Sequence, residues 1–180
     1  MSSELTKEDI FRMFAETDRE IKEAFKETDK KIKELATLFT GQWGKLIEAL
    51  VRPSALKLFQ ERGVKVTETY QRLESYRNGS QMEIDILLAN DREAVVIEVK
   101  TTLKVEDVNE FLDNLARFTF FFPRYKGLKI YGAVAGIQIE EGADKFAYRQ
   151  GLFVLTGSGD TGIVRILNNP EFRPRNFGDR

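Results

Sequence analysis

Three residues in the stretch MEIDILLANDREAVVIEVK, residues 82–100, could do chemistry together. Asp85 lies in its first apolar run, and Glu98 and Lys100 lie in its second. Carboxylate oxygens are the ligands that Mg²⁺ prefers, and an ammonium beside the ion could orient or help activate a metal-bound water. The residue types therefore indicate a metal site, provided that the fold brings the three side chains together.

The two apolar runs, 82–89 and 93–100, are predicted to be neighbouring strands joined by a short turn at Asn90 and Asp91. A two-residue turn sets Ala89 opposite Arg92. Counting back along both strands gives two further pairs, Asp85 with Val96 and Glu83 with Glu98. Because side chains alternate between the faces of a strand, one face is expected to hold Glu83, Asp85, Val96, Glu98 and Lys100. The other face is expected to hold Ile84, Ile86, Val95, Ile97 and Val99.

In this register the carboxylates of Asp85 and Glu98 are diagonal neighbours. Two carboxylates about 5 Å apart repel by about 3 kcal/mol at an effective dielectric constant of 20. A divalent cation would remove that cost, and Mg²⁺ usually keeps several waters, so two carboxylates suffice to hold it. The alternative is a solvated strand face that carries charges of both signs without any metal.

Composition narrows the chemistry that is open to the chain. It has 180 residues, enough for one domain plus an appendage, and no Cys and no His. Catalytic triads that contain His, Cys–His pairs and His-rich zinc sites are therefore excluded. With 28 basic and 29 acidic residues the net charge is −1, so any binding of nucleic acid must be local.

The first forty residues carry an eleven-residue repeat. Its three copies, over residues 6–38, read TKEDIFRMFAE, TDREIKEAFKE and TDKKIKELATL. Eleven residues span three helical turns, so the recurring apolar columns form a stripe along one helix. We expect this helix, residues 1–40, to form a coiled coil between copies of the chain and thus a homo-oligomer. The alternative is that the stripe packs back onto the rest of the chain, and a break is expected at Thr40–Gly41.

Residues 41–169 are predicted to form a mixed sheet flanked by helices. Helices are expected at 45–62, at 105–122 before Pro123, and at 142–150. Strands are expected at 64–76, 82–89, 93–100, 128–139, 151–157 and 162–168. The segment TGSGDTG, residues 156–162, lacks the Lys-Ser/Thr of a phosphate-binding loop and is interpreted as a hairpin turn. Residues 170–180 are expected to be an irregular tail.

Asp85, twelve intervening residues and then Glu98-Val99-Lys100, within this order of elements, resemble the PD-(D/E)xK nuclease superfamily. The resemblance implies a restriction-endonuclease-like fold and metal-dependent hydrolysis of nucleic acid, most simply by a Mg²⁺-dependent DNA endonuclease, with Mn²⁺ as a substitute ion. It implies that Asp85 and Glu98 bind the metal, that Lys100 lies beside the attacking water, and that Glu48 of the first helix is a further metal ligand and catalytic residue. The motif's Pro is replaced by Ile84. The alternative is a catalytically silent module of the same fold that binds DNA or protein.

The N-terminal segment MSSELTKEDI is charged and does not resemble a signal peptide. No run of 18 uncharged apolar residues occurs in the chain. We therefore expect a cytoplasmic protein without a membrane partner.

Overall fold

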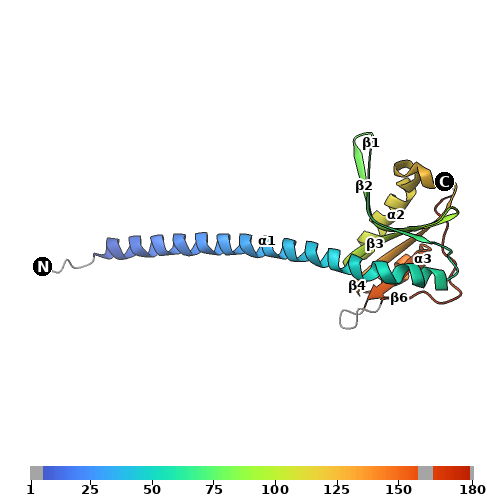
Figure 1. Cartoon of the computed structure of the whole chain (residues 1–180). Coiled ribbons are helices and arrows are strands. Elements are labelled where there is room, and N and C mark those ends of the chain that lie inside the picture. The colour runs from blue at the N-terminus through green and yellow to red at the C-terminus, as the bar shows by residue number, and fades with distance from the viewer. Residues whose placement is uncertain (1–5, 158–163, 179–180) are drawn as a thin grey trace. The chain divides into compact units, whose positions relative to one another are not determined.

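The computed structural model of the chain describes residues 6–157 and 164–178, with the side chains of residues 36–50 outside the description. Its elements follow the chain in this order: α1 (Lys7–Glu61), β1 (Glu68–Arg77), β2 (Ser80–Ala89), β3 (Glu93–Leu103), α2 (Val105–Phe121), the 3₁₀ turn η1 (Pro123–Tyr125), β4 (Lys129–Ile139), α3 (Ala143–Arg149), β5 (Phe153–Gly157) and β6 (Val164–Ile166) (Figure 1). None of the helices in the described ranges is both long and apolar enough to cross a membrane.

The strands of the described residues form one six-stranded mixed sheet, in the order β1-β2-β3-β4-β5-β6. Neighbouring strands are antiparallel from β1 to β3 and again between β5 and β6. The central pairs β3–β4 and β4–β5 are parallel, because helices α2 and α3 form the crossovers between them. The predicted mixed sheet flanked by helices is thus confirmed.

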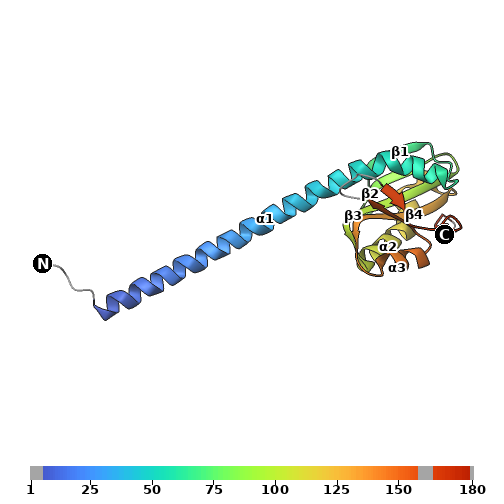
Figure 2. The ribbon, with the colours of Figure 1, turned by 90° about the horizontal axis from the view of Figure 1, so that it is seen from below.

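Helices cover both faces of this sheet, with the end of α1 on one face and α2 and α3 on the other (Figure 2). On the α1 face, Phe59 is fully buried and its ring meets that of Phe153 edge-on at 5.0 Å. On the α2 face, Phe111 and Phe118 are buried against the sheet. Such burial contributes about 1.5–3 kcal/mol for each large apolar side chain, and it fixes the strands that carry the candidate site.

The predicted helix break at Thr40–Gly41 is wrong, because α1 continues to Glu61 with Pro53 inside it. Glycine costs a helix only about 1 kcal/mol, and an internal proline about 3 kcal/mol. Burial of Val51 and Phe59 in the core offsets that cost. The helix ends before Gly63, whose φ of 82° is left-handed. The chain nevertheless divides into two compact units, Met1–Gln42 and Trp43–Arg180.

Several predicted element bounds shift by a few residues. The first strand begins at Glu68 rather than 64, and the third extends to Leu103 rather than 100. The helix before Pro123 is confirmed as Val105–Phe121. Most of the predicted turn at 156–162 lies outside the described residues.

Candidate functional site

The register between β2 and β3 differs by two residues from the predicted one. Ala89 pairs with Ala94 and Ile86 with Ile97, so the last pair of the ladder encloses four residues, 90–93, instead of the expected two. The cause is Asn90, whose side-chain oxygen accepts hydrogen bonds from the backbone N–H groups of Arg92 at 2.8 Å and Glu93 at 2.7 Å.

The corrected register changes the cross-strand neighbours of the candidate residues. Continuing it by one residue places Asp85 opposite Glu98 rather than opposite Val96, and Glu83 is no longer opposite Glu98. Because strand side chains alternate with a period of two, a two-residue shift by itself does not move a side chain to the other face. Asp85 and Glu98 therefore become direct neighbours instead of diagonal ones.

Asp85 lies one residue beyond the last backbone pair between β2 and β3, which is Ile86 with Ile97, and it is half-buried. The backbone N–H of Val99 donates a hydrogen bond of 2.7 Å to its Oδ2. The carboxylate thus satisfies a strand N–H at the point where the backbone ladder stops. Asp85, which was predicted only as a metal ligand, therefore has a structural contact as well.

Glu98 and Lys100 lie two residues apart on β3 and form an ion pair. Lys100 Nζ is 2.8 Å from Glu98 Oε1, and the two side chains are 34% and 17% exposed, respectively. Burial lowers the pKa of Lys100, but the hydrogen bond and charge of Glu98, followed by the charges of Asp107 and Asp85, outweigh it and raise the pKa above its ordinary value. We call Asp85, Glu98 and Lys100 the carboxylate–lysine cluster.

Asp107, which sequence analysis did not single out, adds a third negative charge near Lys100. It stands in the first turn of α2, where its Oδ2 accepts a hydrogen bond of 2.8 Å from the backbone N–H of Lys104. An acidic residue three positions after a strand-to-helix junction is a helix-capping signal, and this signal could have located Asp107.

Beside the cluster, the alternation of faces along β2 reverses. Ile86 is buried on the α1 face as predicted, but Ile84 and Leu87 are both buried on the α2 face. On β1, Arg72 falls between the residues paired with Ile84 and Ile86, opposite Asp85, and its φ is 51°. A non-glycine residue with positive φ is uncommon and marks a local distortion of the strands. Ile84 therefore lies on the face opposite to Ile86, and its predicted face is wrong.

The remaining predicted ligand, Glu48, lies in α1, and its side chain is outside the described residues. Among the side chains that the structure describes, no three acidic groups gather closely enough to hold a metal ion. The described donors of the candidate site are therefore the two carboxylates of the carboxylate–lysine cluster.

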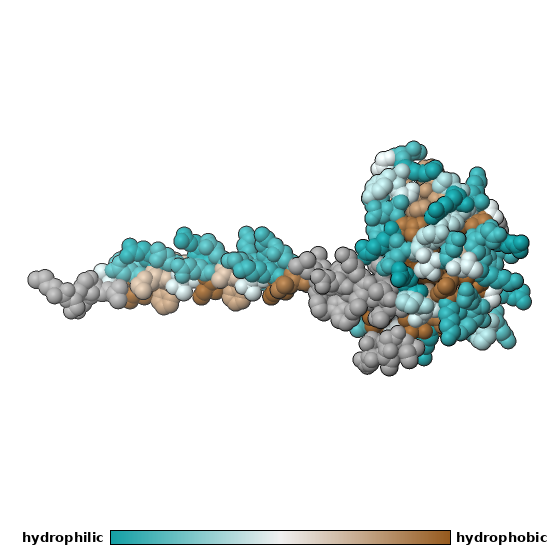
Figure 3. Space-filling model, viewed as in Figure 1, coloured by the Kyte–Doolittle hydropathy of each residue, from teal (hydrophilic) through white to brown (hydrophobic). Residues whose placement is uncertain are grey.

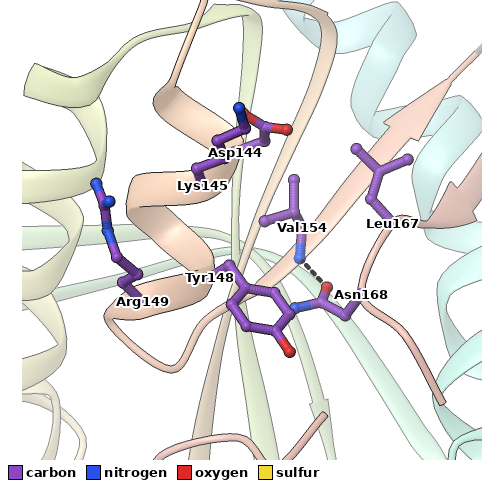
Figure 4. A pocket seen from close by; sticks show the side chains of 7 residues that line it. All are labelled: Asp144, Lys145, Tyr148, Arg149, Val154, Leu167 and Asn168. Atoms are coloured by element: carbon purple, nitrogen blue, oxygen red, sulfur yellow. Dashed lines mark hydrogen bonds between the residues drawn. The ribbon is translucent and has the colours of Figure 1, made fainter. Parts of the chain in front are cut away.

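A separate pocket of about 310 Å³ lies beside α3 and β5 and is lined by Asp144, Lys145, Tyr148, Arg149, Val154, Leu167 and Asn168 (Figure 4). Asn168 is buried, its Oδ1 accepts a hydrogen bond of 2.7 Å from Val154 N–H, and its Nδ2 donates one of 3.1 Å to the Leu152 carbonyl. Tyr148 accepts a hydrogen bond of 3.2 Å from Asn169. These polar groups hold the end of the chain against β5, so we interpret the pocket as structural.

Comparison with protein-family models and with curated proteins finds no match. Two solved structures are similar. One is a repair endonuclease from Pyrococcus abyssi, with 18% identity over 57% of this chain and 43% of that one, and a TM-score of 0.38. The other is a protein of unknown function, with 23% identity over 59% of this chain and 56% of that one, and a TM-score of 0.38. This chain spans about half the length of each, and similarity at this level carries no functional argument.

Proposed function

We propose that the chain is a Mg²⁺-dependent nuclease that hydrolyses phosphodiester bonds in DNA. The proposal rests on one observation, which is that Asp85 on β2 lies opposite Glu98 on β3 when the strand register is continued, beside the ion pair of Glu98 with Lys100. The order of these residues along the chain is that of the PD-(D/E)xK superfamily, which the sequence resembles.

The donor set suits a hydrated Mg²⁺ ion. Asp85 and Glu98 supply hard oxygen ligands from adjacent strands, and Mg²⁺ commonly binds through one or two carboxylates while it keeps several waters. Mn²⁺ prefers the same donors. Glu48 is proposed as a further ligand. When bound, the ion supplies the Lewis acid that acidifies water and neutralises phosphate charge.

The residues of the chain then perform distinct tasks. In hydrolysis, a water molecule loses a proton and its oxygen forms a bond to phosphorus, the bond from phosphorus to the leaving sugar oxygen breaks, and that leaving oxygen takes up a proton. Lys100 donates hydrogen bonds and positive charge to the phosphate oxygens as negative charge grows on them. The ion pair with Glu98 keeps the ammonium in place, and the charge of Asp107 raises the pKa of Lys100 and so favours its protonated form.

The test is incubation of the pure full-length protein with plasmid, single-stranded and branched DNA, in Mg²⁺ and in Mn²⁺. Cleavage is expected to fall by at least about 100-fold in Lys100→Ala. The matched control is Lys57→Ala, since Lys57 is a highly exposed lysine on α1. Failure to cleave every substrate, or cleavage undiminished in Lys100→Ala, rejects the proposal.

A second candidate is a catalytically silent module that binds DNA or protein. It is favoured by the two-carboxylate donor set among the described side chains and by the near-neutral net charge of −1. Magnesium titration separates the two candidates. An ion at 100 times its dissociation constant stabilises the folded state by about 2.7 kcal/mol, which raises the melting temperature by about 5–10 °C in a chain of this length. A silent module without a metal site shows no such shift.

A further inference from the structure

The N-terminal part of α1 exposes a continuous apolar stripe. Figure 3 shows hydrophobic side chains along one edge of this part of the helix and hydrophilic ones along the other. Among the large apolar side chains of the stripe, Phe14 is 70% exposed, Phe25 69% and Leu35 65%. Isolated exposed apolar residues are common on protein surfaces, but an ordered row of them marks an interaction site.

The stripe follows the eleven-residue repeat through its described part. The columns of the repeat place Ile10, Ile21 and Ile32 along one line, with Phe14 and Phe25 beside it. A strict eleven-residue period gives a right-handed supercoil, so a helix that pairs along the whole stripe must have the same period. A second copy of this chain meets that requirement.

Charged residues lie on either side of the stripe. An eleven-residue repeat that spans three turns advances about 98° per residue, so the residue after each isoleucine and the residue before it lie on opposite flanks. One flank holds Phe11, Lys22 and Lys33, and the other holds Asp9, Glu20 and Lys31. Lys31 also pairs within its own helix with Glu27 at 2.8 Å.

A second copy can place opposite charges beside the stripe in either orientation. In a parallel arrangement the opposite flanks of neighbouring helices meet, whereas in an antiparallel arrangement like flanks meet. Parallel, in-register copies bring Lys22 to Glu20, and antiparallel copies centred on Ile21 bring Asp9 to Lys31. Each arrangement also brings like charges together, so the shared period of the stripe, rather than the flanks, selects the second copy as the partner. We propose that the stripe is a self-association surface that joins copies of this chain through a right-handed coiled coil.

The mass of the full-length chain tests the association. Light scattering over a range of concentrations is expected to give a multiple of the 20.7 kDa chain mass. Ile21→Asp, within the stripe, is expected to shift the mass toward the monomer, while its control Arg19→Asp, on the charged face, retains the multiple. Circular dichroism checks that the sheet of the Ile21→Asp variant still melts as in the unmodified chain. A monomeric unmodified chain, or equal masses for the two variants, overturns the proposal.

Cross-linking tests whether the stripe itself is the contact. The chain contains no cysteine, so an introduced thiol has no competitor. A disulfide requires Cα atoms within about 7 Å of each other. Under mild oxidation Ile21→Cys is expected to form a covalent dimer, since the middle isoleucine meets its copy in either orientation. The control Arg19→Cys, on the opposite face of the helix, is expected to stay uncross-linked. Absence of a cross-link in Ile21→Cys, or equal cross-linking in both variants, overturns the proposal. Neither experiment depends on nuclease activity.

Discussion

Asp85 contacts the β3 backbone and also supplies a candidate ligand, and two substitutions separate these roles. Asp85→Ala and Asp85→Asn both remove the negative charge. Only Asp85→Asn keeps an oxygen that can accept the hydrogen bond from Val99 N–H, which is 2.7 Å long in the native chain. Any relief of repulsion with Glu98 is therefore common to both variants and cancels when they are compared.

The remaining difference is the cost of leaving a partly buried N–H without its partner, which is about 1–3 kcal/mol. Asp85→Ala is thus expected to be less stable than Asp85→Asn by about 2 kcal/mol, or to melt about 4–8 °C lower in a chain of this length. Urea titration and thermal melting of the metal-free protein measure the difference. Glu83, exposed on the same strand, provides the control, and Glu83→Ala and Glu83→Asn should agree within about 0.5 kcal/mol.

Magnesium adds a second readout to the same variants. If Asp85 is a ligand, the rise in melting temperature with Mg²⁺ is lost in both Asp85→Ala and Asp85→Asn, although only one of them is destabilised. Equal stability of the two variants without metal would refute the assigned hydrogen-bonding role. A Mg²⁺-induced shift that persists in Asp85→Asn would refute the ligand role.

Three further predictions concern stability. Gly132→Ala places a methyl group 2.5 Å from leucine side chains on α2 and before β5, and is expected to cost about 1–3 kcal/mol in urea denaturation. Asn168→Ala removes two buried hydrogen bonds to the backbone around β5 and is expected to cost about 2–4 kcal/mol; a loss below 0.5 kcal/mol would contradict this. The pKa of Lys100 in the folded chain is raised above its ordinary 10.5, so its positive charge stabilises the folded state. Lys100→Met is therefore expected to be less stable than the unmodified chain at neutral pH, and this difference is expected to fade as the pH rises through the folded pKa. Metal-free melting curves of both proteins across that range measure it, and a difference that grows with pH would contradict the sign.

The sequence predicts the strands and faces of the candidate site better than their register. Alternation with a period of two identifies which residues of β3 are buried, and this signal survives a register error of two residues. The length of the loop depends on a single side chain, Asn90, whose oxygen accepts two backbone N–H groups. An Asn-Asp pair is compatible with loops of either length, so the dipeptide alone could not decide between them.

Two other features could not be predicted, for different reasons. The positive φ of Arg72, opposite Asp85, has no sequence signal, because arginine is not a residue type that favours that conformation. The continuity of α1 through Gly41 and Pro53 is a case in which helix packing overrides local propensity. Pro123, by contrast, ends α2 where its missing N–H requires, and that boundary was predictable.

The hydrogen bond between Asp85 and Val99 affects which residues would distinguish active relatives of this chain from inactive ones. If the proposed nuclease function holds, a descendant that lost catalysis would still need an acceptor for that strand N–H, so selection for folding alone would retain an aspartate or asparagine at position 85. Glu98 and Lys100 form an ion pair with each other and, under the same proposal, could change together once hydrolysis was no longer needed. The pair on β3, rather than the acid on β2, is therefore the more informative place to distinguish working members of such a lineage from inactive ones.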